Sequence, residues 1–384
     1  MTDSTASAKK MKTKAFGIFS FFTGAGFLDL GFEDAGFQPL MANEIAADFA
    51  GVYRYAHDGM KKPLPRFGLQ VDDIRSYLKI PAKKKELLAK IREAKKTCKF
   101  IGFIGGPPCP DFSVAGKQAG ATGKNGQLSQ VYVDLICLRR PDFFVFENVK
   151  GLWQTAKHRA FFDALVEQLQ NHGYAVDYRL INALEYGAPQ DRERIILIGI
   201  KTSLCKGHAN KKTKRLVDFP WEHFIKHNLE DVKATKWPTT NKFKRGGKRT
   251  MPTGIIPELT VEHWFEKNEV EKHPNGNDFF QPRAGLAKMQ VIEEGDDSKK
   301  CFKRLHRWRY SPTAAYGNNE VHLHPYKERR LSVAEALAIQ SLPKEFCLPP
   351  DISLSAKFKT IGNGVPYVAA LGIAKTLRQF LMEL

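Results

Sequence analysis

The sequence predicts an α/β fold built on a doubly wound sheet, because apolar strand-like runs alternate with segments of helical periodicity. Sharp turns rich in Gly or Pro follow several of these runs. Ligands bind at the carboxyl ends of strands in such sheets, so we expect the functional site at these turns. The predicted strands are 15–21, 100–104, 143–146, 174–181 and 195–200, with a short strand ending at 42–44, and the predicted helices are 28–35, 46–57, 128–138 and 158–171.

A second, smaller domain is predicted where this alternation stops. Residues 201–310 hold 24 basic and 14 acidic side chains, a net of +10 out of +19 for the whole chain. Regular structure returns with a helix at 332–340, for which Ser332 is the expected N-cap and Glu335 its capping-box partner. A last helix is expected at 365–384. The predicted divisions are a disordered tail at 1–13, a main domain at 14–200, the smaller domain at 201–305 and a return segment at 306–384.

Composition and charge restrict the class of protein. Hydrophobic residues make up 42% of the chain, enough for a buried core, and no run of about 18 apolar residues predicts a membrane span. The N-terminus lacks the apolar region of a secretory signal. The six cysteines show neither Cys-x-x-Cys pairs nor zinc-site spacing, so we expect free thiols in a reducing cytosol and no metal. The charge fits a polyanionic partner, although charge alone is equally consistent with solubility.

The Gly-rich turn at residues 22–26 follows a predicted strand and opens a helix. Glycines there let the backbone approach a ligand, and the helix start offers free N–H groups. A turn of this kind is by itself often only a tight turn. Glu44, about 20 positions later at the end of the next strand, is placed to accept the hydroxyls of a ribose. The pair predicts a cofactor that contains adenosine, with nicotinamide and S-adenosylmethionine both open.

Cys109 separates these two cofactors. It lies in the segment 105–113, Gly-Gly-Pro-Pro-Cys-Pro-Asp-Phe-Ser, directly after a strand. A cysteine is usually a small buried hydrophobic residue. Here the prolines stiffen a turn that directs the thiol toward the cofactor edge, where a nucleophile needs exposure and a lowered pKa. A nicotinamide oxidoreductase has no need for this Pro-Pro-Cys turn.

Three other segments carry candidate chemistry. Glu147 closes a strand and is either a strand-end cap or a general acid with a raised pKa. The charged segment 190–194 is either a solvated face or, because alternate residues share a face of an extended chain, a segment that points Gln190, Arg192 and Arg194 together into a site. The Gly- and Lys-rich segment 114–127 is either a disordered loop or a mobile lid over an anionic substrate.

Taken together, these motifs resemble those of the DNA cytosine-5 methyltransferases, in particular the bacterial modification enzymes. Each motif is weak alone, but their order along almost the whole chain is specific. The matching motifs are Phe22-Thr23-Gly24-Ala25-Gly26, Asn43-Glu44, Asp73-Ile74, Pro108-Cys109, Glu147-Asn148-Val149, Gln190-Asp191-Arg192-Glu193-Arg194, Arg330-Leu331-Ser332 and Gly362-Asn363-Gly364-Val365-Pro366.

The resemblance implies a Rossmann-like S-adenosylmethionine-dependent methyltransferase sheet with a smaller DNA-recognition domain, and a last helix that packs back onto the first domain. It implies methyl transfer to carbon 5 of a flipped cytosine in duplex DNA. Cys109 would add covalently to carbon 6 of the base, with Glu147 as its acid partner. Arg192 would help to hold the cytosine, and Arg194 would support the site around Cys109.

The resemblance also assigns binding residues. Phe22 would stack on adenine, and Glu44 and Asp73 would hold the ribose and the adenine amino group. The implied S-adenosylmethionine-binding residues are Phe22, Gly24, Gly26, Glu44, Asp73, Ile74, Pro107, Leu128, Asn363 and Val365. The implied DNA-binding residues are Ser113, Lys117, Lys124, Arg245, Lys248 and Arg249, of which the last three are equally suited to read guanine edges or to grip phosphates.

Two positions depart from the family pattern. Phe27 stands where the family usually has a second glycine, which predicts a narrower cofactor pocket. Pro110 stands where glutamine is common, which leaves open how the gap behind the extruded base is filled.

The partners that the resemblance implies are duplex DNA and a cognate restriction endonuclease. We expect a monomeric enzyme of the bacterial cytoplasm that meets the nucleoid through DNA, with no membrane partner. Two rival classes are a DNA-binding protein with an inactive methyltransferase core and an RNA cytosine-5 methyltransferase. The intact Cys109, Glu147 and Arg192 argue against the first, and the basic insertion argues against the second.

Overall fold

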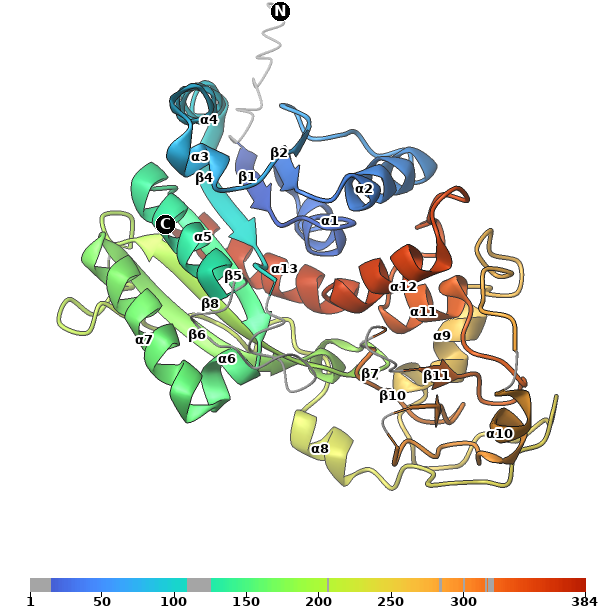
Figure 1. Cartoon of the computed structure of the whole chain (residues 1–384). Helices are drawn as coiled ribbons and strands as arrows, with labels where there is room; N and C mark the ends of the chain where they lie inside the picture. The colour runs from blue at the N-terminus through green and yellow to red at the C-terminus, as the bar shows by residue number, and fades with distance from the viewer. Residues whose placement is uncertain are drawn as a thin grey trace, which may run out of the picture.

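One seven-stranded sheet forms the centre of the computed structural model (Figure 1), which describes residues 15–108, 126–205, 207–282, 285–299, 301–314, 316 and 321–384. The strand order is β3-β2-β1-β4-β5-β8-β6. The first five strands are parallel, whereas β8 is antiparallel to both of its neighbours. The strands are β1 Ala15–Phe21, β2 Phe37–Glu44, β3 Leu69–Val71, β4 Cys98–Gly105, β5 Phe143–Val149, β6 Tyr174–Asn182 and β8 Glu193–Lys201.

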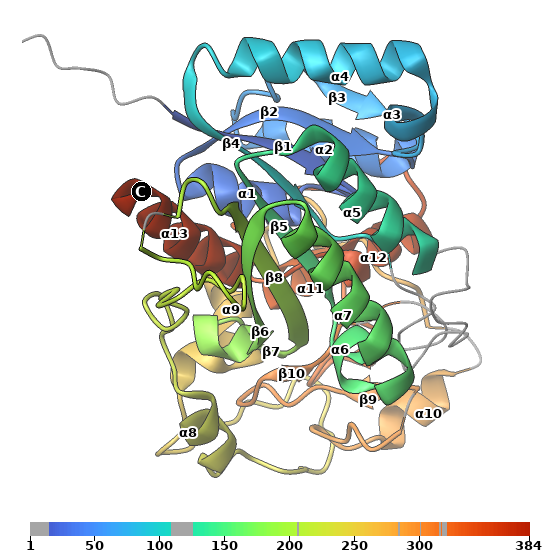
Figure 2. The same cartoon turned by 90° about the vertical axis from the view of Figure 1, so that its left-hand side faces the viewer.

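Helices cover both faces of this sheet, as the alternating pattern predicts (Figure 2). One face packs against α1 and α13, and the other packs against α4, α5 and α7. The central strands are buried on both sides, which explains why they read as continuous apolar runs. The helices of the main body are α1 Phe27–Asp34, α2 Ala47–Gly59, α3 Ser76–Lys79, α4 Pro81–Ala94, α5 Gly126–Arg139, α6 Gly151–Gln154, α7 Ala156–Asn171 and α13 Tyr367–Glu383.

The end of the chain returns to the main body. Helix α11 (Val333–Ile339) begins at the capping box of Ser332 and Glu335, as the sequence predicts. It packs with α12 (Leu354–Asn363) and α2, and α13 then lies along α1. Among the described residues, no helix is both long enough and apolar enough to cross a membrane.

Gly31 sets the contact between α1 and α13. A Cβ added at Gly31 would lie 2.6 Å from Ala370 Cβ. We therefore expect Gly31→Ala to force the helices apart and to lower the free energy of unfolding by about 1–3 kcal/mol. Gly51 on α2 has nothing within 4 Å of an added Cβ, so Gly51→Ala should be neutral or stabilising by up to about 1 kcal/mol. Denaturant unfolding compares the two variants, and equal stabilities would contradict this packing.

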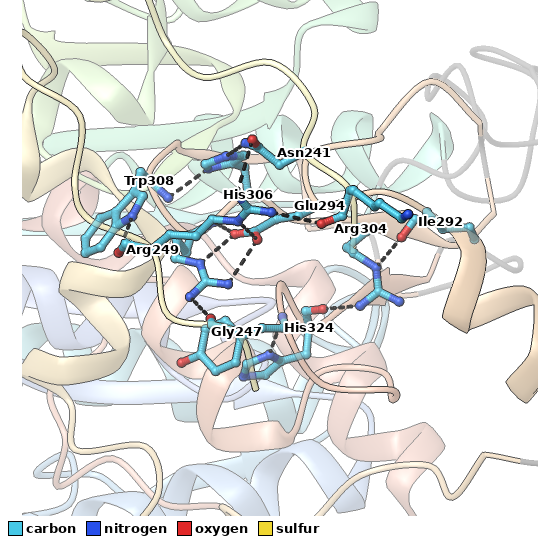
Figure 3. A network of polar contacts seen from close by, with 12 residues as sticks. Asn241, Gly247, Arg249, Ile292, Glu294, Arg304, His306, Trp308 and His324 are labelled. Atoms are coloured by element: carbon cyan, nitrogen blue, oxygen red, sulfur yellow. Dashed lines mark hydrogen bonds and ion pairs between the residues drawn. The ribbon is translucent and has the colours of Figure 1, made fainter. Parts of the chain in front are cut away.

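The smaller unit, the part of the chain from α8 to the start of α11, is built on short elements and polar contacts. A two-stranded sheet pairs β9 with β11, and β10 pairs with β7 of the main body. The Glu294 carboxylate receives two hydrogen bonds from the Arg307 guanidinium, at 2.7 and 3.0 Å. It receives another from Arg249 at 3.2 Å (Figure 3). The elements of this unit are α8 Leu229–Ala234, α9 Val261–Lys267, α10 Leu286–Val291, β9 Lys303–Arg304, β10 Ser311–Pro312 and β11 His322–Leu323, and β7 of the main body is Gln190–Asp191.

The chain does not leave the main body at the end of β8. Cys205, Leu216 and Phe219 are buried in the core that α1 and α13 share with the sheet. Ile225 also packs against this core, whereas Val232 belongs to a separate cluster with Leu184. The packing therefore changes near residue 228, and residues 202–225 form an extension of the main body.

Candidate active site

A cavity of about 1030 Å³ opens at the carboxyl ends of β1, β2, β4 and β5. The end of the chain closes it, because residues of α12 and the segment that follows it contribute to its wall. It brings together residues that are far apart in the sequence. The candidate residues that line it are Phe22, Gly24, Glu44, Asp73, Ile74, Pro107, Leu128, Glu147, Arg192, Arg194, Asn363 and Val365.

The turn after β1 has a constrained backbone. Phe22, Gly24 and Gly26 have φ angles of 55°, 56° and 83°. A positive φ at a residue as bulky as Phe22 is rare and is typical of functional turns. An added Cβ at Gly24 would meet nothing within 4 Å, so this backbone faces open space, whereas at Gly26 it would lie 2.6 Å from the Tyr53 ring. Gly26 is not part of the cavity wall, and its small size serves the packing of α1 against α2.

Acidic side chains and an apolar residue form the wall that β2 and β3 provide. Both oxygens of Glu44 accept backbone hydrogen bonds, from Gly24 at 2.9 Å and from Ala46 at 2.9 Å. Asp73 accepts the backbone N–H of Arg75 at 2.8 Å and pairs with its guanidinium at 3.0 Å. Ile45 is 64% exposed beside them and lines the cavity. Carboxylates beside an exposed apolar side chain suit a ligand that combines hydroxyl or amino groups with a flat ring.

Glu147 lies at the opposite wall of the cavity. Its Oε1 is 2.9 Å from Nε of Arg194. Burial raises the pKa of Glu147 above its usual value, and the positive charges of Arg194 and Arg192 oppose that rise. An added Cβ at Gly106 would lie 2.5 Å from Oε2 of Glu147, so a side chain at this position would displace the carboxyl group. A buried carboxyl group with a raised pKa is suited to donate a proton.

Arg192 connects this wall to the returning chain. Its guanidinium donates to the carbonyl groups of Ala314 at 3.1 Å and Gly362 at 2.9 Å. Within the described part of the chain, Nε of Arg192 is buried and has no hydrogen-bond partner. Burial lowers the pKa of Arg192 well below its usual value, and the neighbouring Arg194 adds to that effect. A buried donor at a cavity wall indicates that a polar group of a ligand completes the site.

Several candidate residues fall outside the described part of the chain, namely Cys109, Ser113, Lys117 and Lys124, and so does Pro110. The turn that leads to Cys109 is described as far as Pro108, which lines the cavity. Asn148 holds that turn, because its side chain donates to the Pro107 carbonyl group at 3.3 Å. Among the described residues, no group of three or more His, Cys, Asp or Glu side chains could hold a metal ion.

The three basic candidates of the smaller unit have different surroundings. Arg245 is 79% exposed and lies 3.5 Å from Glu328, and Lys248 is exposed. Arg249 instead belongs to the buried network, since it contacts Glu294 and donates to the Lys242 carbonyl group at 2.8 Å (Figure 3). Arg245 and Lys248 are therefore better placed than Arg249 to meet a polyanion.

Phe27, which departs from the family pattern, packs against the return segment. An added Cβ at Gly364 would lie 2.0 Å from the Phe27 ring, and Phe27 meets Phe346 edge to face with ring centroids 5.2 Å apart. Phe27 also lines the cavity. The side chain thus occupies space between the turn and the end of the chain.

Sequence reasoning missed several polar residues of the cavity. Asp29 lies one helical turn after the Gly-rich turn, and its position in an apolar stretch was the available signal. Tyr316, His322 and Thr360 also line the cavity, and within the described residues Tyr316 Oη, His322 Nδ1 and Thr360 Oγ1 are buried without a hydrogen-bond partner. No pattern in the sequence marks these three, because the fold alone brings them to the cavity.

Comparison with known proteins gives consistent matches along the chain. The family model of the C-5 cytosine-specific DNA methylases matches residues 16–379. The Type II methyltransferase M.NmeDI of Neisseria meningitidis serogroup C is 56% identical over 364 residues, which cover 95% of this chain and 84% of that protein. M.FnuDI of Fusobacterium nucleatum, also a Type II methyltransferase, is 28% identical and covers 95% of each chain. The crystal structure of the S. pombe Dnmt2 methyltransferase has the same fold, with a TM-score of 0.58 over 96% of this chain and 99% of that chain, at 12% identity.

Proposed function

Because the chain belongs to the family of C-5 cytosine-specific DNA methylases, we propose that its cavity holds S-adenosylmethionine beside a cytosine turned out of duplex DNA. The chain is a DNA (cytosine-5)-methyltransferase with Type II relatives. One observation carries the proposal: a single cavity joins the wall of Glu44 and Asp73 to the wall of Glu147 and Arg192. The two reactants can therefore meet in one enclosure, which a base stacked in a duplex could not enter.

The residues at one end of the cavity fit S-adenosylmethionine, which supplies the methyl group when it is bound. The open space at Gly24 admits a chain close to the backbone. Glu44 and Asp73 offer carboxylate oxygens to hydroxyl and amino groups, and Ile45 and Ile74 offer apolar surface to a ring. We assign Phe22, Leu128, Asn363 and Val365 to the same pocket, because they line it.

The residues at the other end fit the cytosine. The Cys109 thiolate adds to carbon 6 of the ring, and Glu147 donates a proton or hydrogen bond to N3 as negative charge develops there. Carbon 5 thereby becomes nucleophilic enough to attack the methyl group, whose bond to the donor sulfur breaks. A base then removes the carbon 5 proton, and elimination of the Cys109 thiolate restores the aromatic ring. Arg192 offers its buried Nε–H to a polar atom of the base, and Arg194 holds the Glu147 carboxyl group in place.

Bisulfite sequencing of host DNA after expression of the chain tests this function. We expect one short sequence to carry 5-methylcytosine at every copy, and none in cells with the empty vector. Purified protein with labelled methyl donor should modify duplex DNA that contains this sequence. Transfer to an RNA of the same sequence, with none to the duplex, would overturn the proposal.

We assign recognition of the DNA target sequence to the smaller unit. We expect this sequence preference to move with the unit when it is transplanted into a related enzyme. Because residues 202–225 pack into the main core, the transplanted segment should begin near residue 228 and end before the capping box of α11. A relative that receives this segment should methylate this chain's sequence, as measured by bisulfite sequencing of its products. An unchanged preference would place recognition elsewhere.

We also propose a protective role opposite a restriction endonuclease, since the names of the relatives describe Type II methyltransferases. Duplex DNA methylated by this chain should resist an endonuclease that cuts the same sequence. Cleavage of fully methylated DNA by such an endonuclease would count against this role.

A further inference from the structure

A buried carboxylate lies directly beneath the Gly-rich turn. Asp29, in the first turn of α1, is 2% exposed and forms part of the cavity wall. Its Oδ1 accepts a hydrogen bond from Oγ of Ser20 at 2.7 Å, and its Oδ2 accepts one from Oγ1 of Thr23. Ser20 is at the end of β1, so the carboxylate joins the strand, the turn and the helix.

The two hydroxyl groups are left as acceptors toward the cavity. A hydroxyl group has one proton and two lone pairs. Because Ser20 and Thr23 each donate that proton to Asp29, each presents only lone pairs to a ligand. Both residues line the cavity, as Asp29 does. Such a surface attracts a cationic N–H donor rather than a carbonyl or carboxylate group.

Asp29 forms no ion pair with a Lys or Arg among the described residues, and the cationic group that favours its charged form is His57, which itself pairs with Glu33. Burial raises the pKa of Asp29 to about 6, and the hydrogen bonds from Thr23 and Ser20 oppose the rise. A buried carboxylate without an ion-paired Lys or Arg is unfavourable. A cationic group of the ligand would stabilise it by forming that ion pair.

We propose that Asp29, together with Ser20 and Thr23, binds the α-ammonium group of the methionine moiety of S-adenosylmethionine. The inference rests on the proposed function, because it concerns the same pocket and the same ligand. The ligand's sulfonium is a second cation that this acceptor surface could attract. S-adenosylhomocysteine keeps the ammonium group and lacks the sulfonium charge, so it distinguishes the two.

Calorimetric binding to the full-length protein tests the assignment without any methyl transfer. The two probes are S-adenosylhomocysteine and an analogue in which hydrogen replaces its α-amino group. Asp29→Asn should weaken binding of S-adenosylhomocysteine by about 10- to 100-fold, since a hydrogen bond to a charged group contributes this much. The same variant should change binding of the desamino analogue by less than about 3-fold.

Two further variants serve as a matched control and as a partial loss of the acceptor surface. Asp34→Asn removes a carboxylate from the same helix that pairs with Lys62 and does not line the cavity, so binding should stay at the wild-type value. Ser20→Ala removes one acceptor and leaves the carboxylate, and should cause a smaller loss that is again confined to the probe with the amino group.

The outcomes distinguish failure of the Asp29 assignment from failure of the proposed function. Equal weakening of both probes by Asp29→Asn, or no weakening of either, would overturn the role of Asp29 while the proposed function stands. A sulfonium contact is indicated instead if Asp29→Asn weakens only S-adenosylmethionine and not S-adenosylhomocysteine. Failure of the wild-type protein to bind either natural ligand would overturn the proposed function itself.

Discussion

Replacing Cys109 with alanine should leave the protein folded and able to bind duplex DNA, but reduce methyl transfer by more than about four orders of magnitude. Carbon 5 of cytosine is too weak a nucleophile to attack a methyl sulfonium, so the reaction depends on prior addition at carbon 6. Among the described residues no thiol lines the cavity, because cysteines 98, 137, 205, 301 and 347 lie elsewhere. None of these described cysteines can therefore replace the lost nucleophile.

The measurement is turnover of labelled methyl groups on duplex DNA, together with DNA affinity from a binding assay. Cys301→Ala is the matched control, since Cys301 is partly exposed and does not line the cavity. Duplex DNA with 5-fluorocytosine at the target should form a stable covalent adduct with the wild-type protein and none with Cys109→Ala. Retained turnover in the alanine variant would disprove the assignment of Cys109.

The sheet was predictable because its strands are buried on both faces. Runs such as 143–146 are apolar throughout, and polar residues or Gly- and Pro-rich turns mark where they end. Helix α4 was missed because half of its residues are charged, and only Leu87, Ile91 and Ala94 are buried. A helix with so narrow an apolar stripe resembles a charged loop in sequence.

The site was predictable wherever a residue ends a strand. Glu44 and Glu147 follow this rule, and both line the cavity. Sequence patterns do not reveal contacts that tertiary packing decides. Gly26, predicted to bind the cofactor, lies against Tyr53, and Arg249, predicted to bind DNA, contacts the buried Glu294. Neither neighbour is close in sequence, so no local pattern reveals the contact.

The structure of the smaller unit was also not predictable from sequence periodicity. Its described core contains buried ionic groups. Burial alone would raise the pKa of Glu294, but hydrogen bonds from Arg307 outweigh this effect, so the pKa lies below its usual value. Arg304 is also buried, and donates to the carbonyl groups of Ile292 and Lys327 at 2.8 and 3.0 Å. Buried charges leave no apolar periodicity, so this unit appears as a basic, loop-rich segment in the sequence.

Glu147→Gln should lower kcat by about 10²- to 10⁴-fold while binding of S-adenosylhomocysteine and DNA remains within a few-fold of wild type. The amide can still accept the hydrogen bond from Arg194 Nε and still fits beside Gly106, so the geometry of the wall is preserved. What it cannot do is release a proton to N3 of the base. Glu193→Gln is the matched control, because Glu193 pairs with Lys150 and does not line the cavity.

The pH dependence separates a proton donor from a merely structural carboxylate. Burial raises the pKa of Glu147, so its protonated form persists to higher pH than that of an exposed glutamate. If the protonated form is the active one, kcat of the wild-type protein falls as pH rises through that raised pKa, and the fall is absent in Glu147→Gln. A wild-type profile in which kcat instead rises over the same interval would mean that the ionised carboxylate is the active form. The carboxylate would then act by orienting Arg194, and Glu147→Asp with a restored ion pair would recover activity that Glu147→Gln does not.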